Sequence, residues 1–421
     1  MMNKSLSKIF FVSGVITIVA LFASCDLPHY PENNIVPGSN ASIEQNAYSP
    51  LTIAPVNASL PSDYMRGIDA SEVKALEEAG FVFYDEDNSQ KDVFEILKLH
   101  GVNWIRLRIW NDYTKADTSE WAPYGFNNLN RTLNMAQRAK KYGMKVLLDF
   151  HYSDTWADPG KQICPDMWKD ISDIDELALA VADWTKEILL SMKEENCLPD
   201  MIQLGNENEG GIFTTNSAVA VPLGLANSAK VLSQAASAVR SVSDRIEIML
   251  HMSAGGDSAR LEGFYNNFIS KVDCDVVGLS YYPYYSGHKS VTSLAANCAK
   301  ITNTFHKKAV IAEISYGYSL DAWSDYTSNT FYTDQEKTSA GNMSDYANGS
   351  SSIPASLENQ IGVVRHVIEK TAANGASGIF YWGACYLGVE GKVQSSWENQ
   401  ALFDPNGKAL PSLNVMNVQG N

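Results

Sequence analysis

Short apolar runs and longer amphipathic segments alternate along most of the chain. Eight of the short runs predict β-strands, at 64–69, 102–110, 144–152, 201–207, 246–252, 276–282, 309–314 and 378–383. Segments whose apolar residues recur every three or four positions predict helices, at 91–100, 129–142, 176–195, 223–242, 258–271, 291–306 and 357–374. Strand–helix alternation predicts parallel strands with right-handed crossovers, and eight units close into a (β/α)8 TIM barrel, an α/β fold. We expect one such domain over residues 63–421.

Polar side chains share one face of two predicted strands. In the second strand, alternation places Arg106, Arg108 and Trp110 together. In the third strand, it places Asp149 with His151. Arginines inside a barrel are costly unless carboxylates pair with them. Asp149 is therefore a natural partner for an inward arginine.

Two predicted strands end in a glutamate. Asn206 and Glu207 follow the apolar run 201–204, and Glu313 follows 309–312. The C-terminal ends of barrel strands form the active-site face of this fold. Two carboxylates there can serve as proton donor and as nucleophile or base, which glycoside hydrolysis requires. A polar turn after a strand explains one such residue, but less readily two.

Other strand ends carry aromatic and polar side chains as well. His251 ends the fifth predicted strand, Tyr281 and Tyr282 end the sixth, and Trp382 ends the eighth. Ordinary core packing explains each of them when it is taken singly. Their common position at one end of most strands favours a shared site.

Composition narrows the range of ligands. The chain has 421 residues, of which 45% are hydrophobic, enough for a large core. Its formal net charge of −16 argues against nucleic acid or an anionic surface as the partner. Nine Trp and 20 Tyr supply planar faces that suit sugar rings. The six Cys include no CxxC pair, which argues against zinc. Without Cys25 five remain, so at most two disulfides could form; the sequence does not identify their pairs, and the remaining cysteines are expected to be buried free thiols.

Residues 1–24 have the pattern of an export signal. Lys4 and Lys8 precede an apolar stretch, and small residues follow it. Cys25 then stands where a bacterial lipoprotein is processed, so we expect a mature chain that begins at lipidated Cys25. A membrane-spanning anchor is the alternative, but the apolar stretch is short for one.

The stretch 25–62 predicts a flexible tether. It holds six prolines among Asn and Ser, without helical or strand periodicity. A small strand module is the alternative. Signal, lipid and tether together predict an exported protein, anchored to a bacterial outer membrane in its inner leaflet or at the cell surface. Its contact with the membrane would be through the lipid only.

Six motifs carry a resemblance to a known family. They are FVFYDE (81–86), WIRLRIWN (104–111), DFHYSDTWADP (149–159), GNE (205–207), AE (312–313) and SWENQALFD (396–404). They resemble the endo-β-1,4-galactanases of glycoside hydrolase family 53, within a clan of retaining (β/α)8-barrel glycosidases. The resemblance runs from about residue 64 to about residue 413, and the motif at 149–159 is its most specific part.

The resemblance implies roles for both glutamates. Glu207 is implied as the acid/base and Glu313 as the nucleophile of a double displacement, while Asn206 would bind the sugar 2-hydroxyl. Asn208 and Glu209 form a competing Asn-Glu pair. Alternation does not exclude that pair, but Glu207 is closer to the strand and matches the family motif.

The resemblance also implies supporting residues. Arg108 or Arg106 would keep Glu313 ionised, and Tyr281 or Tyr282 would orient it. The other side chains expected to contact substrate are Trp110, His151, Asp154, Trp156, His251 and Trp382. The expected substrate is β-1,4-galactan, arabinogalactan or galacto-oligosaccharide, bound by a monomer.

The implied chemistry requires no cofactor, but family members can carry calcium between the loops after strands seven and eight. Asp321, Ser395 and Glu398 supply oxygen ligands for a structural Ca²⁺ here. The loop 318–325 departs from the acidic family pattern and lacks its histidine. Ordinary loop acids are therefore an equal alternative.

Two other functional classes remain open. A related β-glycanase of the same clan, a mannanase or a cellulase, would carry the same pair of glutamates. A non-catalytic lipoprotein that captures glycan would not need them. A peptidase is not indicated, because neither a Gly-x-Ser-x-Gly nor a His-Glu-x-x-His motif occurs.

Overall fold

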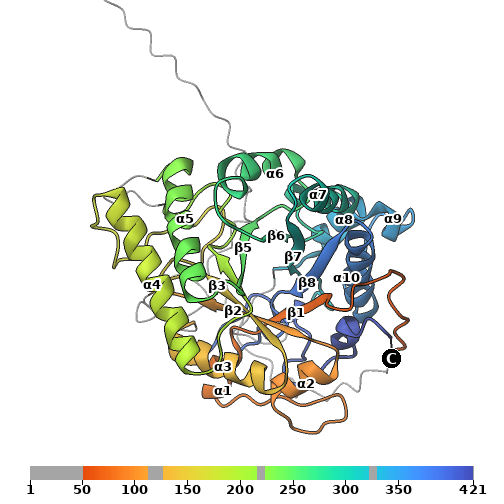
Figure 1. Ribbon diagram of the computed structural model, residues 1–421. Helices are drawn as coiled ribbons and strands as arrows, with labels where there is room; N and C mark the ends of the chain where they lie inside the picture. Colours follow the sequence, from red (N-terminus) through yellow and green to blue (C-terminus); the bar gives the residue numbers. More distant parts are fainter. Residues whose placement is uncertain (1–50, 112–126, 216–222, 322–329, 421) are drawn as a thin grey trace, which may run out of the picture. The chain divides into compact units, whose positions relative to one another are not determined.

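Eight parallel strands pair in sequence order, and β8 pairs with β1, so the sheet closes into a barrel (Figure 1). The computed structural model describes residues 51–111, 127–215, 223–321 and 330–420. The predicted export signal, Cys25 and the tether up to residue 50 lie outside the described residues. The predicted (β/α)8 TIM barrel is confirmed.

All the strands occur where the apolar runs predict them. They are β1 (Met65–Asp69), β2 (Trp104–Ile109), β3 (Lys145–Phe150), β4 (Met201–Leu204), β5 (Glu247–Met252), β6 (Val276–Ser280), β7 (Lys308–Ile314) and β8 (Ala376–Tyr381). Several end earlier than predicted. Asn206 and Glu207, for example, lie in the turn after β4 and not within the strand.

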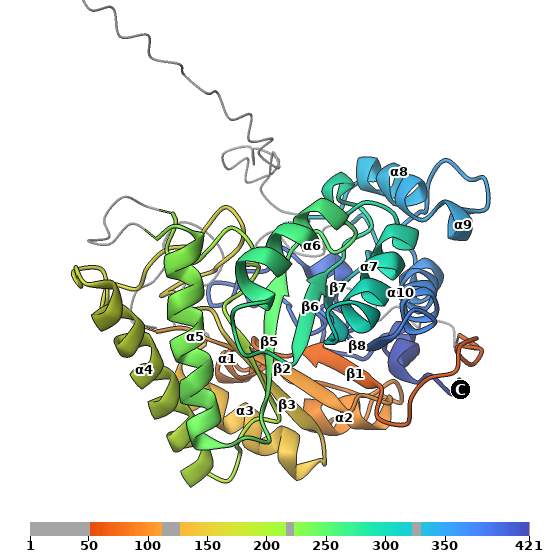
Figure 2. The same cartoon turned by 45° about the horizontal axis from the view of Figure 1, so that its top comes forward.

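Helices surround the barrel. They are α1 (Val73–Glu78), α2 (Val93–Leu99), α3 (Leu129–Lys141), α4 (Ile174–Glu194), α5 (Leu225–Val242), α6 (Ser258–Phe264), α7 (Val291–Asn303), α8 (Thr333–Asn342), α9 (Ser344–Ala347) and α10 (Leu357–Ala372). Figures 1 and 2 show them outside the strands, with α4 and α5 side by side. In α4, the predicted apolar face is buried through Leu177, Val181 and Ile188. Within the described residues, every helix is too short or too polar to span a bilayer.

Three helices and one change of helix type were not predicted. α1 has only six residues and α9 only four, too few for a periodic pattern. α8 buries Glu336, Ser339 and Ala340, so it has no apolar stripe. The helix predicted over 258–271 leaves the α-form after Phe264 and continues as a π-turn.

The inside of the barrel has an apolar layer below a charged one. The apolar layer consists of Met65, Trp104, Leu147, Met201, Met249, Val276, Val310, Ala312 and Phe380. Two residues further along β2 and β3, the same inward face presents Arg106 and Asp149, which are fully buried. Alternation along each strand therefore stacks charged groups on a hydrophobic floor, towards the C-terminal ends of the strands.

The segment 51–62 packs on the barrel and is not part of a tether. Ile53 and Val56 are buried in the main core, and the Val56 N–H donates to the Val418 carbonyl at 2.9 Å. Figure 1 shows this red segment beside the C-terminus. The boundary predicted at residue 63 is therefore wrong, because apolar side chains without periodicity can still be buried by irregular chain.

The described cysteines are all free thiols, so the disulfides that the sequence left open do not form among them. Cys164, Cys197, Cys274, Cys298 and Cys385 are all buried and unpaired. Burial raises the pKa of the Cys274 thiol to about 11. A thiol that stays protonated and buried is a poor nucleophile. These cysteines therefore act as packing residues.

Candidate active site

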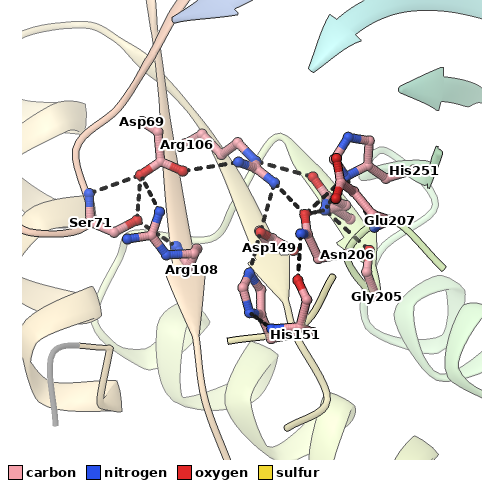
Figure 3. Close-up of polar contacts among 12 residues, drawn as sticks. Asp69, Ser71, Arg106, Arg108, Asp149, His151, Gly205, Asn206, Glu207 and His251 are labelled. Atoms are coloured by element: carbon pink, nitrogen blue, oxygen red, sulfur yellow. Dashed lines mark hydrogen bonds and ion pairs between the residues drawn. The ribbon is translucent and has the colours of Figure 1, made fainter. Parts of the chain in front are cut away.

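Arg106 lies at the centre of the candidate site (Figure 3). β2 directs it into the barrel, where the side chain is fully buried. All five of its N–H groups have oxygen partners: Gln203 Oε1 (3.1 Å), Asp69 Oδ2 (3.0 Å), Glu313 Oε1 (2.9 Å), Asp149 Oδ2 (2.8 Å) and Asn206 Oδ1 (2.8 Å). One guanidinium thus connects side chains from β1, β3 and β7 with the end of β4.

Arg108 does not reach Glu313, so the cation paired with Glu313 is Arg106. The Arg108 guanidinium binds Glu72 and lies 3.2 Å from Asp69 Oδ1. Burial by itself would raise the pKa of Asp69, but Arg108 and Arg106 together hold it below its ordinary value. The direct substrate contact expected of Arg108 is not supported, because its side chain is buried.

Glu313 is held at the end of β7 by two donors. Arg106 Nη1 lies 2.9 Å from Oε1, and the Tyr282 hydroxyl donates to Oε2 at 2.7 Å. Burial raises the pKa of Glu313, and Arg106 and Tyr282 oppose that effect. Tyr281 is directed elsewhere and donates to the Lys289 carbonyl at 3.3 Å. Of the two tyrosines considered, Tyr282 is therefore the one that orients Glu313.

The turn after β4 places Glu207 in a left-handed backbone conformation. Its φ is +46°, and Gly205 just before it has φ +78°. A Cβ on Gly205 would approach the Asn208 Nδ2 atom to 2.3 Å, so only glycine fits there. The Asn208 N–H donates to the His251 carbonyl at 3.1 Å, which fixes this turn against β5.

Glu207 is set up to retain its proton. Burial raises its pKa well above the ordinary value, and the negative charge of Glu313 raises it further. Among the described residues, Glu207 has no ion pair with a cation, whereas Glu313 has Arg106. The two environments therefore favour a protonated Glu207 beside a Glu313 that an arginine stabilises as the anion.

Asn206 presents a fixed amide beside Glu207. Its Oδ1 accepts from Arg106 Nη2 at 2.8 Å and from Gln203 Nε2 at 3.0 Å. Its Nδ2 donates to the Ala157 carbonyl at 2.8 Å. Within the described part of the chain, the second Nδ2 hydrogen has no partner. It is therefore a donor that a ligand can use.

The competing pair, Asn208 and Glu209, is excluded by its contacts. Glu209 Oε1 lies 2.8 Å from Arg260 Nη1, and the Ser253 hydroxyl donates to the same carboxylate. Asn208 is fully buried and donates to the Leu204 carbonyl at 2.9 Å. Both residues stabilise the loop, so Glu207 remains the second glutamate of the site.

Three residues expected to contact substrate, Trp110, His151 and His251, instead support the site from below. Trp110 is buried and donates through Nε1 to His151 Nδ1 at 3.3 Å. His151 Nε2 lies 3.1 Å from Asp149 Oδ2. His251 is fully buried, with Nε2 3.0 Å from Ser280 Oγ. All three side chains are buried and contact other residues of the site, so they act as supports for it.

The two tryptophans expected as stacking platforms lie at the rim. Trp156 and Trp382 are half-buried, with ring centroids 6.0 Å apart. Arg108 lies beneath them, its guanidinium carbon 4.3 Å from the Trp156 centroid. Asp154 is also half-buried, but its carboxylate accepts the Asp166 N–H at 2.9 Å and so holds the loop after β3.

Five residues of the network were not predicted from the sequence. They are Asp69, Ser71, Glu72, Gln203 and Ser280. Two of them had a usable signal: Asp69 ends an apolar strand, and Gln203 is a polar residue inside one. Glu72 and Ser71 follow β1 in irregular chain, where no periodicity indicates which way a side chain points.

The structure shows the contacts of the expected calcium ligands. Asp321 is exposed, whereas Ser395 donates to the Tyr386 carbonyl at 2.6 Å and Glu398 accepts the Gly388 N–H at 3.3 Å. In the described ranges, no group of three or more His, Cys, Asp or Glu side chains could hold a metal ion. Residues 322–325 of the first loop lie outside those ranges. Calcium stays a prediction.

Fold and site together define the class of protein. Two glutamates, from the ends of β4 and β7, lie at the C-terminal face of a (β/α)8 barrel, one paired with an arginine and the other favouring its protonated form. This is the constellation of a glycoside hydrolase.

Sequence comparison identifies the family. Residues 65–416 match Glycosyl hydrolase family 53, and the chain belongs to that family. The protein is therefore a glycoside hydrolase of the galactanase type.

The chain is similar to members of this family both in sequence and in structure. The chain is 32% identical over 391 residues to an endo-beta-1,4-galactanase of Bacillus subtilis, covering 84% of this chain and 85% of that one. It is 31% identical over 366 residues to an arabinogalactan endo-beta-1,4-galactanase of Cellvibrio japonicus, covering 82% and 89%. The structure of the Ignisphaera aggregans GH53 catalytic domain superposes with a TM-score of 0.77 at 36% identity, over 88% and 99% of the two chains.

Glu207→Gln is expected to stabilise the fold at neutral and alkaline pH. Because the pKa of Glu207 is raised in the folded state, its contribution to stability falls as pH rises from the unfolded to the folded pKa. Replacing it with the neutral amide removes that loss. We expect the melting temperature to exceed that of the wild type by about 2–4 °C at pH 8 and to match it near pH 4, as measured by calorimetry.

The matched control is Glu209→Gln, which weakens an ion pair with Arg260 and should lower the melting temperature at pH 8. A melting-temperature difference for Glu207→Gln that does not change with pH would contradict the raised pKa.

Proposed function

We propose that this enzyme is a retaining endo-β-1,4-galactanase that cleaves galactan or type I arabinogalactan to galacto-oligosaccharides. The observation that carries the proposal is the pair Glu207 and Glu313, with Arg106 binding both Glu313 and Asn206. The substrate is inferred from the names of the relatives, which are endo-beta-1,4-galactanases of the same family. An acidic protein with half-buried tryptophans at the rim of its site suits a neutral polysaccharide.

In the first step, Glu313 attacks the anomeric carbon while Glu207 protonates the departing glycosidic oxygen. A covalent galactosyl-enzyme forms as the bond to the leaving sugar breaks. The raised pKa of Glu207 suits this acid role because it favours the protonated carboxyl. Attack by Glu313 requires the two carboxyl groups to be about 5–5.5 Å apart.

In the second step, Glu207 acts as the base. Glu313 loses its charge on forming the covalent bond, so the repulsion that raises the pKa of Glu207 disappears. Glu207 then accepts a proton from water, which attacks the anomeric carbon and releases the sugar with retained configuration. Arg106 and Tyr282 stabilise Glu313 as it leaves.

The remaining groups bind the sugar. The second Nδ2 hydrogen of Asn206 can donate to the 2-hydroxyl of the galactosyl residue under attack. The accessible faces of Trp156 and Trp382 can stack on sugar rings along the cleft. Binding of nucleic acid is not expected from this acidic chain, and we propose that the enzyme acts as a monomer.

Glu207→Ala and Glu313→Ala should each lose more than 10³-fold in kcat/KM on galactan, because each removes one partner of the double displacement. Azide distinguishes their roles on an activated aryl galactoside. With Glu207→Ala, azide should attack the galactosyl-enzyme and give the β-azide. With Glu313→Ala, it should replace the nucleophile and give the α-azide. Circular dichroism checks that both variants are folded, and near-normal turnover by either one would refute the assignment.

Substrate profiling tests the galactan specificity. We expect linear β-1,4-galactan to be cut at least 100-fold faster than β-1,4-mannan or cellulose at equal concentration, with mixed oligosaccharides as the first products. Chromatography of products over time measures both rate and endo-action. Preferred cleavage of mannan or cellulose would show a related β-glycanase, and binding without products would show a glycan-capture protein.

We further propose that the enzyme is exported and tethered by a lipid on Cys25. Support comes from the sequence of residues 1–25, which combines a basic start, an apolar stretch and a cysteine after small residues. A tether lets an acidic barrel act on polysaccharide outside the cell.

Cys25→Ala should abolish labelling by an alkynyl fatty acid and shift the enzyme from the membrane fraction to the soluble fraction. Cys197→Ala is a control, because that buried cysteine should not affect labelling. Continued labelling of Cys25→Ala would exclude Cys25 as the lipidated residue.

A further inference from the structure

Arg108 is a buried cation to which the double displacement gives no task. Its guanidinium pairs with Glu72 and lies 3.2 Å from Asp69 Oδ1, and its backbone N–H donates to Ser71 Oγ at 2.9 Å (Figure 3). Unlike Arg106, Arg108 does not use every N–H group: its Nε is buried and has no hydrogen-bond partner among the described residues. Hydrogen bonding alone therefore does not explain why this arginine is enclosed here.

Two tryptophan rings at the rim lie over Arg108. Its guanidinium carbon is 4.3 Å from the ring centroid of Trp156 and 5.6 Å from that of Trp382. A guanidinium can bind carboxylates while it stacks on an aromatic ring, which a lysine ammonium cannot do in the same way. Arg108 thus connects Asp69 on β1 with Trp156 in the loop after β3 and with Trp382 after β8.

The orientation of Trp156 depends on contacts with its ring. Trp156 lies in irregular chain, and its Nε1 is buried without a hydrogen-bond partner in the described part of the chain. Its ring centroid lies 5.6 Å from that of Trp110 and 6.0 Å from that of Trp382. Arg108 is 1% exposed, so the part of the indole that it covers is shielded from solvent. The accessible part of Trp156 is left for a ligand.

We propose that Arg108 is a positioning residue for the sugar-binding surface, and that it acts on substrate through the indole of Trp156. Stacking on Arg108 would fix this ring beside Trp382 before a sugar binds. A ring that is already fixed loses less side-chain freedom when the ligand arrives. The inference rests on the proposed role of Trp156 as a stacking platform.

The first test separates KM from kcat in Arg108→Lys. Lysine keeps a positive charge beside Asp69 and Glu72 but lacks the planar group that stacks. Because stacking of a sugar contributes equally to the ground state and the transition state, we expect KM for linear β-1,4-galactan to rise about tenfold, with kcat changed less than about twofold. An unchanged KM, or a loss confined to kcat, would overturn the proposal.

Arg138→Lys is the matched control for this variant. Arg138 on α3 also lies over an aromatic ring, 4.7 Å from the centroid of Phe94, and pairs with Glu77. Its substitution therefore removes the same kind of contact away from the site. We expect KM to stay at the wild-type value.

A double-mutant cycle tests whether Arg108 acts through Trp156. Trp156→Ala by itself should raise KM. Adding Arg108→Lys to Trp156→Ala should then raise KM by less than about threefold, because the ring on which Arg108 acts is gone. A further rise of about tenfold in the double variant would show that Arg108 acts by another route, and would overturn the proposal.

A second replacement serves if Arg108→Lys does not fold. The double variant Arg108→Met with Glu72→Met removes both charges of one buried pair together and leaves Asp69 with Arg106, 3.0 Å away. Replacing a buried ion pair by apolar residues of similar volume is often tolerated. The same rise in KM is expected, and a wild-type KM would overturn the proposal.

The last test needs neither substrate nor a variant of Arg108. In wild-type enzyme labelled with 5-fluorotryptophan, the ¹⁹F signal that is lost in Trp156→Phe belongs to Trp156. We expect this signal to relax as slowly varying, rigid indoles do, like that of Trp168, which is buried and is assigned by Trp168→Phe. A mobile Trp156 ring would overturn the proposal even if the enzyme cleaves galactan. A rigid ring in an enzyme that does not cleave galactan would overturn the proposed function instead.

Discussion

The charge balance around Arg106 is the constraint on which the site depends. A guanidinium enclosed in the barrel must find partners for all its N–H groups, and Asp69, Asp149 and Glu313 provide three of them. Without the cation, three buried carboxylates would face one another, so removing one partner costs far more than an exposed ion pair would. The strands that carry these acids are therefore held together by the same contacts that hold Glu313 at the end of β7.

That network distributes protons unequally between the two glutamates of the site. Glu313 receives a cation and a tyrosine hydroxyl, whereas Glu207 receives burial and the negative charge of Glu313. The same backbone scaffold thus gives one carboxyl the character of an anion and the other that of an acid. This arrangement lowers the stability of the fold, because the buried Glu207 carboxyl has no ion pair with a cation among the described residues. The surrounding fold must therefore be rigid enough to hold Glu207 in place.

Rigidity comes from buried residues behind the site. Trp110 and the Ala157 N–H both donate to His151 Nδ1, and Nε2 of the same ring lies 3.1 Å from Asp149 Oδ2. The chain leaves β3, β4 and β5 through residues with positive φ, namely Tyr152, Glu207 and Ala254. Such conformations persist only where surrounding contacts determine them. Most of the polar residues at the strand ends thus support Asn206, Glu207 and Glu313.

The sequence by itself determined the fold, because apolar periodicity is a local property that burial imposes on every strand and helix of a barrel. It also determined the two glutamates, since each follows an apolar strand, and family motifs distinguished Glu207 from Glu209. Only the tertiary structure decided which arginine meets Glu313, which tyrosine orients it, and that His151, His251 and Trp110 face inward as supports. Those choices depend on side-chain direction and on partners distant in sequence. Periodicity assigns a residue to a face, but the atoms that it touches across the barrel are set by packing of the whole chain.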